Sequence, residues 1–78
     1  MEHIITIYTT PTCHFCHMAK DFFNSKNIKY TEHDVVSDIA KRQEMIQLTG
    51  QLGVPVIVID GEPVVGFNQA VVAQKLGL

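Results

Sequence analysis

Apolar and polar residues follow one another along the chain in short runs that predict alternating strands and helices. Residues 4–9 are β-branched and aromatic, which predicts a strand buried on both faces. Pro11 interrupts this run, and a helix from about Cys13 to Lys26 is predicted to follow, with Asn27 as a left-handed end. Its apolar residues recur at the spacing of one helical face, at Phe15, Met18, Ala19, Phe22 and Phe23.

The middle of the chain predicts a weaker strand and a second helix. Residues 29–35 favour a strand, and Ser37 is a natural N-cap for a helix that runs to about Thr49. Gly50 is expected to end this helix in a left-handed conformation. The residues expected to face the core are Ile39, Met45 and Ile46.

Two further apolar runs predict a hairpin. Residues 56–59 and residues 62–65 favour strands, and Asp60-Gly61 between them is a strong signal for a tight turn. Pro63 cannot donate a ladder hydrogen bond, so the second of these strands is expected at the edge of a sheet.

A last helix over residues 69–76 is predicted, with Asn68 as its cap. The order of elements is therefore βαβαββα, in which the first βαβ unit is parallel and the hairpin antiparallel. We expect a single α/β domain over residues 1–78, with a four-stranded mixed sheet and helices on both faces.

Composition and charge narrow the functions that are possible. Apolar residues make up 46% of the chain, enough for a compact core without a structural disulfide or metal. A net charge of −2 with scattered charges offers no basic surface for nucleic acid. No apolar run approaches the ~20 residues of a membrane span, and the first residues do not resemble a signal peptide. We expect a cytoplasmic protein without a nucleic-acid or membrane partner.

The two cysteines carry the clearest chemical signal. Structural disulfides are rare in a reducing cytoplasm, so the Cys13-x-x-Cys16 spacing indicates redox chemistry or metal binding. The motif lies between a buried strand and a helix, whose cap Thr12 is expected to support. A thiol at a helix amino end is stabilised as thiolate by the dipole and by unpaired N–H groups. Cys13 is therefore the predicted attacking thiol, and Cys16, one turn further in, the predicted resolving thiol.

Two metal-centred alternatives use the same residues. The segment from Cys13 to His17 matches C-x-x-C-H, the attachment signature of c-type haem, but such attachment usually accompanies export. Two cysteines and two histidines also lie within five residues, but neighbours on one helix cannot all converge on a tetrahedral zinc ion. We expect no metal site.

Nearly the whole chain resembles the glutaredoxin family. The matching segments are Ile7-Tyr8-Thr9, Cys13-x-x-Cys16-His17-x-Ala19-Lys20, Gly53-Val54-Pro55, Asp60-Gly61 and Gly66. The resemblance implies a thioredoxin fold and disulfide oxidoreductase activity. It also implies that Pro55 is cis beside the cysteines and that Val54 presents its backbone N–H and carbonyl to the substrate.

The residues around the two thiols depart from the Cys-Pro-Tyr-Cys motif that is typical of the family. His14 replaces the proline and, as a cation, would stabilise the Cys13 thiolate; a solvated position is the alternative. Lys20 is a second candidate for electrostatic tuning, again with a solvated alternative. Phe15 fits the apolar helix face by spacing, but the resemblance implies a substrate contact beside the thiol. His17 is expected on the surface.

The predicted substrate contacts depart from the family as well. Thr10 stands where the family has a glutathione-binding lysine, and Asn68 stands in place of an acidic residue. Val65-Gly66 replaces a Gly-Gly pair. Gly66 and Phe67 are similar to the Gly-Phe of small redoxins that are recharged by thioredoxin reductase. Phe67 is either a platform for protein partners or an anchor for the last helix.

We therefore expect a monomeric oxidoreductase that reduces protein or glutathione mixed disulfides. No bound cofactor is expected, although glutathione is a possible co-substrate, and either glutathione or thioredoxin reductase supplies the electrons. Two alternatives stay open: a glutathione-assisted iron–sulfur cluster carrier, and an electron donor to ribonucleotide reductase recharged by thioredoxin reductase.

Overall fold

The computed structural model describes residues 3–78, and these form four strands and three helices in the predicted order. The elements are β1 (Ile5–Thr9), α1 (His14–Ser25), β2 (Thr31–Asp34), α2 (Ile39–Thr49), β3 (Val56–Ile59), β4 (Glu62–Val65) and α3 (Gln69–Leu76). The predicted fold class is confirmed, although β2 is shorter than the predicted range 29–35. In the described part of the chain, no helix has the length and apolar character needed to cross a membrane.

The strands form one mixed sheet in the order β2-β1-β3-β4. β1 runs parallel to β2, as predicted for a βαβ unit, and β3 is antiparallel to both β1 and β4. Tyr8 near the end of β1 pairs with Val56 at the start of β3, and Val56 pairs with Val65 at the end of β4. The carboxyl ends of β1 and β4 and the amino end of β3 therefore meet at the same end of the sheet.

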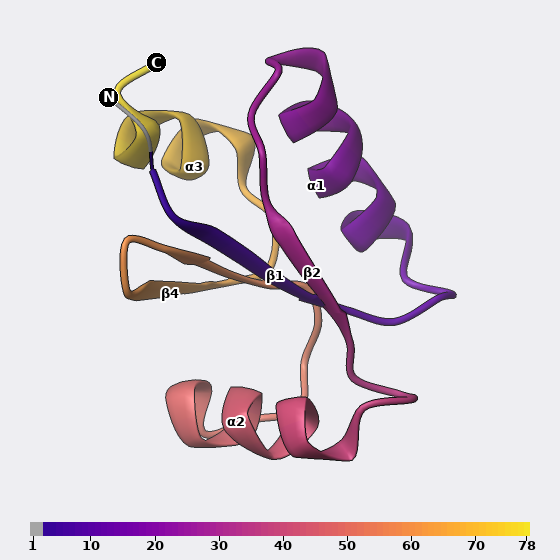
Figure 1. Ribbon diagram of the computed structural model, residues 1–78. Helices are drawn as coiled ribbons and strands as arrows, with labels where there is room; N and C mark the ends of the chain where they lie inside the picture. Colours follow the sequence, from indigo (N-terminus) through magenta and orange to yellow (C-terminus); the bar gives the residue numbers. More distant parts are fainter. Residues whose placement is uncertain (1–2) are drawn as a thin grey trace.

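Helices cover both faces of this sheet. Figure 1 shows α1 and α3 on one side and α2 on the other. The larger core cluster joins the sheet to α1 and α3 and consists of Ile5, Ile7, Ala19, Phe22, Phe23, Ile57, Ile59, Val72 and Leu76. The smaller cluster lies on the α2 face and consists of Tyr8, Val35, Met45 and Val56. Successive residues of β1 thus point to opposite faces, Ile7 toward α1 and Tyr8 toward α2.

The buried stripe of α1 differs in part from the predicted one. Ala19, Phe22 and Phe23 are buried as predicted. Phe15 and Met18 are exposed, because the side of the first turn that faces the sheet carries Cys16 instead. Asn27 follows the helix with a φ of 56°, which confirms the predicted left-handed end.

The start of α2 also corrects the prediction. Its N-cap is Asp38 and not Ser37, because the Asp38 carboxylate accepts a backbone N–H of the first turn at 3.1 Å. Met45 is fully buried and Ile46 half-buried, as expected for core-facing residues. Ile39 was expected to face the core, but it is the first helical residue and most of its side chain lies in solvent.

The β3–β4 hairpin uses the predicted turn. Asp60 and Gly61 have φ values of 52° and 88°, the doubly left-handed pattern of a type I′ turn that matches strand twist. Pro63 lies in β4, an edge strand as predicted. Gly50, with a φ of 73°, ends α2 in the predicted conformation.

Candidate active site

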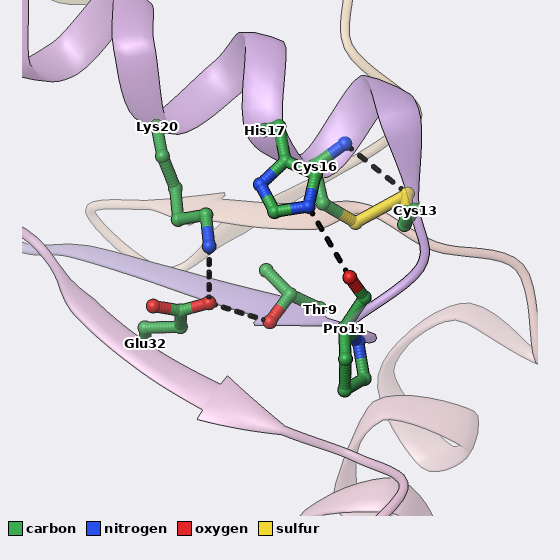
Figure 2. A network of polar contacts seen from close by, with 7 residues as sticks. All are labelled: Thr9, Pro11, Cys13, Cys16, His17, Lys20 and Glu32. Carbon is green, nitrogen blue, oxygen red and sulfur yellow. Dashed lines mark hydrogen bonds and ion pairs between the residues drawn. A yellow bond between two sulfur atoms is a disulfide. The ribbon is translucent and has the colours of Figure 1, made fainter.

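The two cysteines lie where β1 passes into α1, and a disulfide joins them (Figure 2). Their Cα atoms are 5.2 Å apart. Cys16 is fully buried on the side of α1 that faces the sheet, whereas Cys13 is partly exposed. A reagent in solvent can therefore reach Cys13 but not Cys16, which is the asymmetry expected of an attacking and a resolving thiol.

Cys13 is itself the N-cap of α1. Its backbone is extended and its Sγ accepts the backbone N–H of Cys16 at 3.1 Å. The capping role expected for Thr12 is wrong, since the sulfur already occupies the capping position and Thr12 is exposed. The unpaired N–H groups and the positive end of the helix dipole act on this sulfur. Once the disulfide is reduced, both favour the thiolate of Cys13 over its thiol.

The segment before β3 completes this end of the sheet. The Val54–Pro55 peptide bond is cis, as the family resemblance implies. Pro55 is buried, and its carbonyl accepts the N–H of Gly66 at 2.8 Å. Because Tyr8 pairs with Val56, the Val54–Pro55 segment lies beside the start of the cysteine loop. Within residues 3–78 the backbone N–H and carbonyl of Val54 have no hydrogen-bond partner.

The predicted contact residues in and around the cysteine loop are half-buried or exposed. Thr10 is half-buried, and its carbonyl accepts the N–H of Cys13 at 3.3 Å. Phe15 is 56% exposed on the first turn of α1. His14 is exposed as well, and its ring meets that of Phe15 edge-on at a centroid distance of 5.6 Å. The surface position predicted for His17 is confirmed, and its Nε2 lies 3.2 Å from the carbonyl oxygen of Pro11.

The remaining predicted contacts lie after β4. Gly66 is tied to the cis-proline segment by its N–H. Phe67 is half-buried and packs on Phe22 with ring centroids 5.8 Å apart, so it anchors the start of α3 to α1. Asn68 caps α3 as predicted, since its side-chain oxygen accepts two backbone N–H groups of the first turn at 3.1 and 3.3 Å.

Lys20 belongs to a polar network that the motif alone does not predict (Figure 2). Its ammonium is ion-paired with Glu32 at 3.0 Å, and the Thr9 hydroxyl donates to the same carboxylate oxygen at 2.8 Å. The parallel pairing of β1 and β2 brings Thr9 and Glu32 to the same face of the sheet. It places alternate residues of both strands on the face that α1 covers.

The network keeps the carboxylate charged. Burial raises the pKa of Glu32, but hydrogen bonds from Thr9 and Lys20 and the charge of Lys20 outweigh it. The pKa of Glu32 is therefore lower than its ordinary value, even though the neighbouring carboxylate of Asp34 opposes the change. An ionised carboxylate at neutral pH follows from this balance.

The described residues offer no metal cage. In residues 3–78, no group of three or more histidine, cysteine, aspartate and glutamate side chains is arranged to hold an ion.

Comparison with known proteins agrees with this geometry. The family model for glutaredoxin matches residues 5–64. A glutaredoxin-like 8.6 kDa protein of the rubredoxin operon of Clostridium pasteurianum is 49% identical over 67 residues, which cover 86% of this chain and 89% of that protein. Glutaredoxin 3 of Escherichia coli is 40% identical over 64 residues, 82% of this chain and 77% of its own length.

A solved structure extends the match to three dimensions. The crystal structure of the thioredoxin-like protein BC3987 superimposes with a TM-score of 0.85 at 37% identity, covering 91% of this chain and 97% of that one. The paired cysteines at the helix start support thiol–disulfide oxidoreductase chemistry. With this motif, this fold and these relatives, the chain belongs to the glutaredoxin family.

Proposed function

We propose that this chain reduces disulfides by dithiol exchange, with Cys13 as the attacking thiol and Cys16 as the resolving thiol. The observation that carries the proposal is the position of Cys13, whose partly exposed Sγ accepts a backbone N–H at the amino end of α1. The burial of Cys16 supports the division of roles, because a buried thiol cannot meet a substrate in solution first.

The reaction proceeds in two exchanges. The Cys13 thiolate attacks a substrate disulfide, so that a sulfur–sulfur bond forms to Cys13 while the substrate bond breaks and one substrate thiolate leaves and is protonated. Cys16 then loses its proton and attacks Cys13. The second substrate thiol is released, and the Cys13–Cys16 disulfide seen in the structure is the oxidised product. Two electrons from an external thiol reductant restore the dithiol.

Substrates of extended backbone suit the surroundings of Cys13. The unpaired N–H and carbonyl of Val54 can pair with a bound polypeptide as an added strand does. Phe15, two residues after Cys13, offers an exposed apolar surface on the first turn of α1. Thr10 and Asn68 are neutral where the family resemblance implies charged glutathione contacts. We therefore infer that protein disulfides are the better substrates and that glutathione serves weakly.

An NADPH-coupled assay tests the proposal with a protein disulfide as substrate. One arm contains glutathione and glutathione reductase, and the other contains thioredoxin reductase. We expect turnover by the wild-type chain in at least one arm and none by Cys13→Ser. Activity in one arm only identifies the reductant.

Cys16→Ser is the matched variant, because it keeps the attacking thiol. It should form a covalent adduct with the protein disulfide and keep some activity on glutathione mixed disulfides, which need one thiol only. A fully active Cys13→Ser variant, or a Cys16→Ser variant that traps nothing, would overturn the proposed roles. A visible absorbance band in the purified chain, lost in Cys13→Ser, would instead favour the cluster-carrier alternative.

A further inference from the structure

Three residues from three different elements meet in one polar network under α1, the helix that carries the buried thiol. Glu32 on β2 is in register with Ile7 on β1, and Ile7 belongs to the core cluster under α1. Because paired residues share a face of the sheet, Glu32 lies on the face that α1 covers. Thr9, two residues after Ile7, points to that face as well and is 1% exposed.

Cys16 and Lys20 face this group from the helix. They are four residues apart and therefore neighbours on one side of α1, with Cβ atoms about 5–6 Å apart. Cys16 is fully buried against the sheet, and the Lys20 ammonium reaches Glu32 at 3.0 Å. Figure 2 shows the Lys20 ammonium and the Glu32 carboxylate on the sheet side of α1, below the helical turns that carry Cys16 and Lys20.

The two charges have opposite consequences for a thiol that must ionise. A nearby ammonium stabilises the thiolate and lowers its pKa, and a nearby carboxylate does the reverse. The Thr9 hydroxyl holds the carboxylate at 2.8 Å and so fixes its position. Asp34 on β2 is a second carboxylate nearby, and its charge acts to raise the pKa of Glu32. His17 is the titratable residue between Cys16 and Lys20 on α1, and its ring contacts the Pro11 carbonyl.

We propose that the Lys20–Glu32 pair, held in place by Thr9, sets the ionisation of the resolving thiol Cys16, with Lys20 favouring its thiolate and Glu32 opposing it. The inference rests on the proposed role of Cys16. Lys20 and Glu32 are positioning residues that act on the sulfur through charge, and Thr9 acts through its hydrogen bond to Glu32. The side chains of Lys20 and Glu32 are partly exposed, 21% and 37% respectively, so solvent weakens the effect of each charge.

The test is an NMR titration of the reduced protein with ¹³Cβ-labelled cysteine. Glu32→Gln leaves the ammonium unopposed and should lower the pKa of Cys16 by about half a pH unit, roughly a threefold rise in its thiolate fraction. Lys20→Gln leaves the carboxylate unopposed and should raise that pKa by a similar amount. The double variant should return close to the wild-type value, because both opposing charges are gone.

The Lys75–Glu62 pair provides the control. The Lys75 ammonium on α3 lies 2.7 Å from the Glu62 carboxylate on β4. Glu62 pairs with Ile59 and Ile59 pairs with Ile5, so this ion pair lies at the end of the sheet away from the cysteines. Lys75→Gln and Glu62→Gln change the net charge by the same amounts as the test variants. We expect both to leave the pKa of Cys16 unchanged.

Opposite shifts in the two test variants, larger than in the controls, support the inference, since a purely structural role predicts no reversal of sign. Shifts of the same sign, or shifts no larger than the controls, overturn it. Mass spectrometry of the wild-type chain under reducing and oxidising conditions tests the proposed function separately. If Cys13 and Cys16 form and lose their disulfide normally, but the pKa of Cys16 does not change in Lys20→Gln or Glu32→Gln, this inference alone is refuted.

Discussion

Individual side chains show how the two faces of β1 are used differently. Tyr8 points to α2, where its buried hydroxyl donates to Glu44 at 2.6 Å. Burial, the hydrogen bond to Glu44 and the negative charge of Glu44 raise the pKa of Tyr8 to about 12. The next residue, Thr9, points to α1 and donates to Glu32. Adjacent residues thus anchor a helix on one face and a charged pair on the other.

The raised pKa of Tyr8 predicts a pH-dependent contribution to stability. The folded chain binds the Tyr8 proton more tightly than the unfolded chain, in which the pKa has its ordinary value of 10.0. The contribution of this proton to the free energy of unfolding is therefore complete below about pH 10 and is lost as pH rises through about 12. Wild type should therefore lose about 2 kcal/mol more than Tyr8→Phe over this interval. Urea unfolding at several alkaline pH values measures the difference.

Tyr30→Phe is the matched control for this titration, because it removes another tyrosine and retains Tyr8. It should lose stability between pH 10 and 12 as the wild type does. An equal loss in Tyr8→Phe would show that the Tyr8 proton is not responsible.

The helices are held at their amino ends by three different side chains. A sulfur caps α1, a carboxylate caps α2 and an amide caps α3, through Cys13, Asp38 and Asn68 respectively. In α1 the capping atom and the proposed nucleophile are the same sulfur. The Cys16 N–H, which is capped by the Cys13 sulfur, therefore both stabilises the start of α1 and favours the thiolate of Cys13.

This dual role predicts different stabilities for two substitutions of Cys13. Serine is a good N-cap, so Cys13→Ser should keep the free energy of unfolding of the reduced wild type within about 0.5 kcal/mol. Cys13→Ala removes the acceptor for the Cys16 N–H and should cost about 1 kcal/mol. Denaturant unfolding under reducing conditions compares the three proteins. Equal stability of the alanine and serine variants would mean that the sulfur does not cap α1.

Distant parts of the chain are joined at the end of the sheet away from the cysteines. His3 Nδ1 lies 2.6 Å from the carboxylate of Asp60, and the N–H of Ile4 donates to the same carboxylate at 2.8 Å. Asp60 in turn donates its backbone N–H to the carbonyl of Ile4. These contacts hold the residues before β1 against the β3–β4 turn, at the end of the sheet opposite the candidate active site.

The His3–Asp60 contact predicts an acid-sensitive part of the stability. Hydrogen bonds from His3 and from the N–H of Ile4 hold the pKa of Asp60 below its usual 3.8. The contribution is therefore present above that value and is lost as pH falls through the lowered pKa. Asp60→Asn keeps a residue that tolerates the left-handed turn but removes the charge.

We expect the Asp60→Asn variant to show a shallower fall in its urea midpoint than the wild type as pH falls below about 4. His3→Gln, which removes the partner but keeps the carboxylate, should lie between the two. Parallel pH profiles for all three proteins would contradict this assignment.

Local patterns along the chain were sufficient for the elements, their order and the cysteine motif. Spacing of apolar residues, a tight-turn dipeptide and a cap are short-range features, because each depends on neighbours within about one or two helical turns. The positions of Cys13 and Cys16 at the start of α1 follow from such features, and so do the Asp60-Gly61 turn and the Asn68 cap. The cis bond before Pro55 followed from the family resemblance.

Contacts between distant segments could not be predicted in the same way. Thr9, Lys20 and Glu32 meet because β2 pairs with β1 in one particular register, and a shift by a single residue would turn Glu32 to the other face. The exposure of Ile39 and Met18 likewise depends on which side of each helix packs on the sheet. Local pattern specifies what each segment forms, but register and packing are long-range properties, and they decide which side chains surround the thiols.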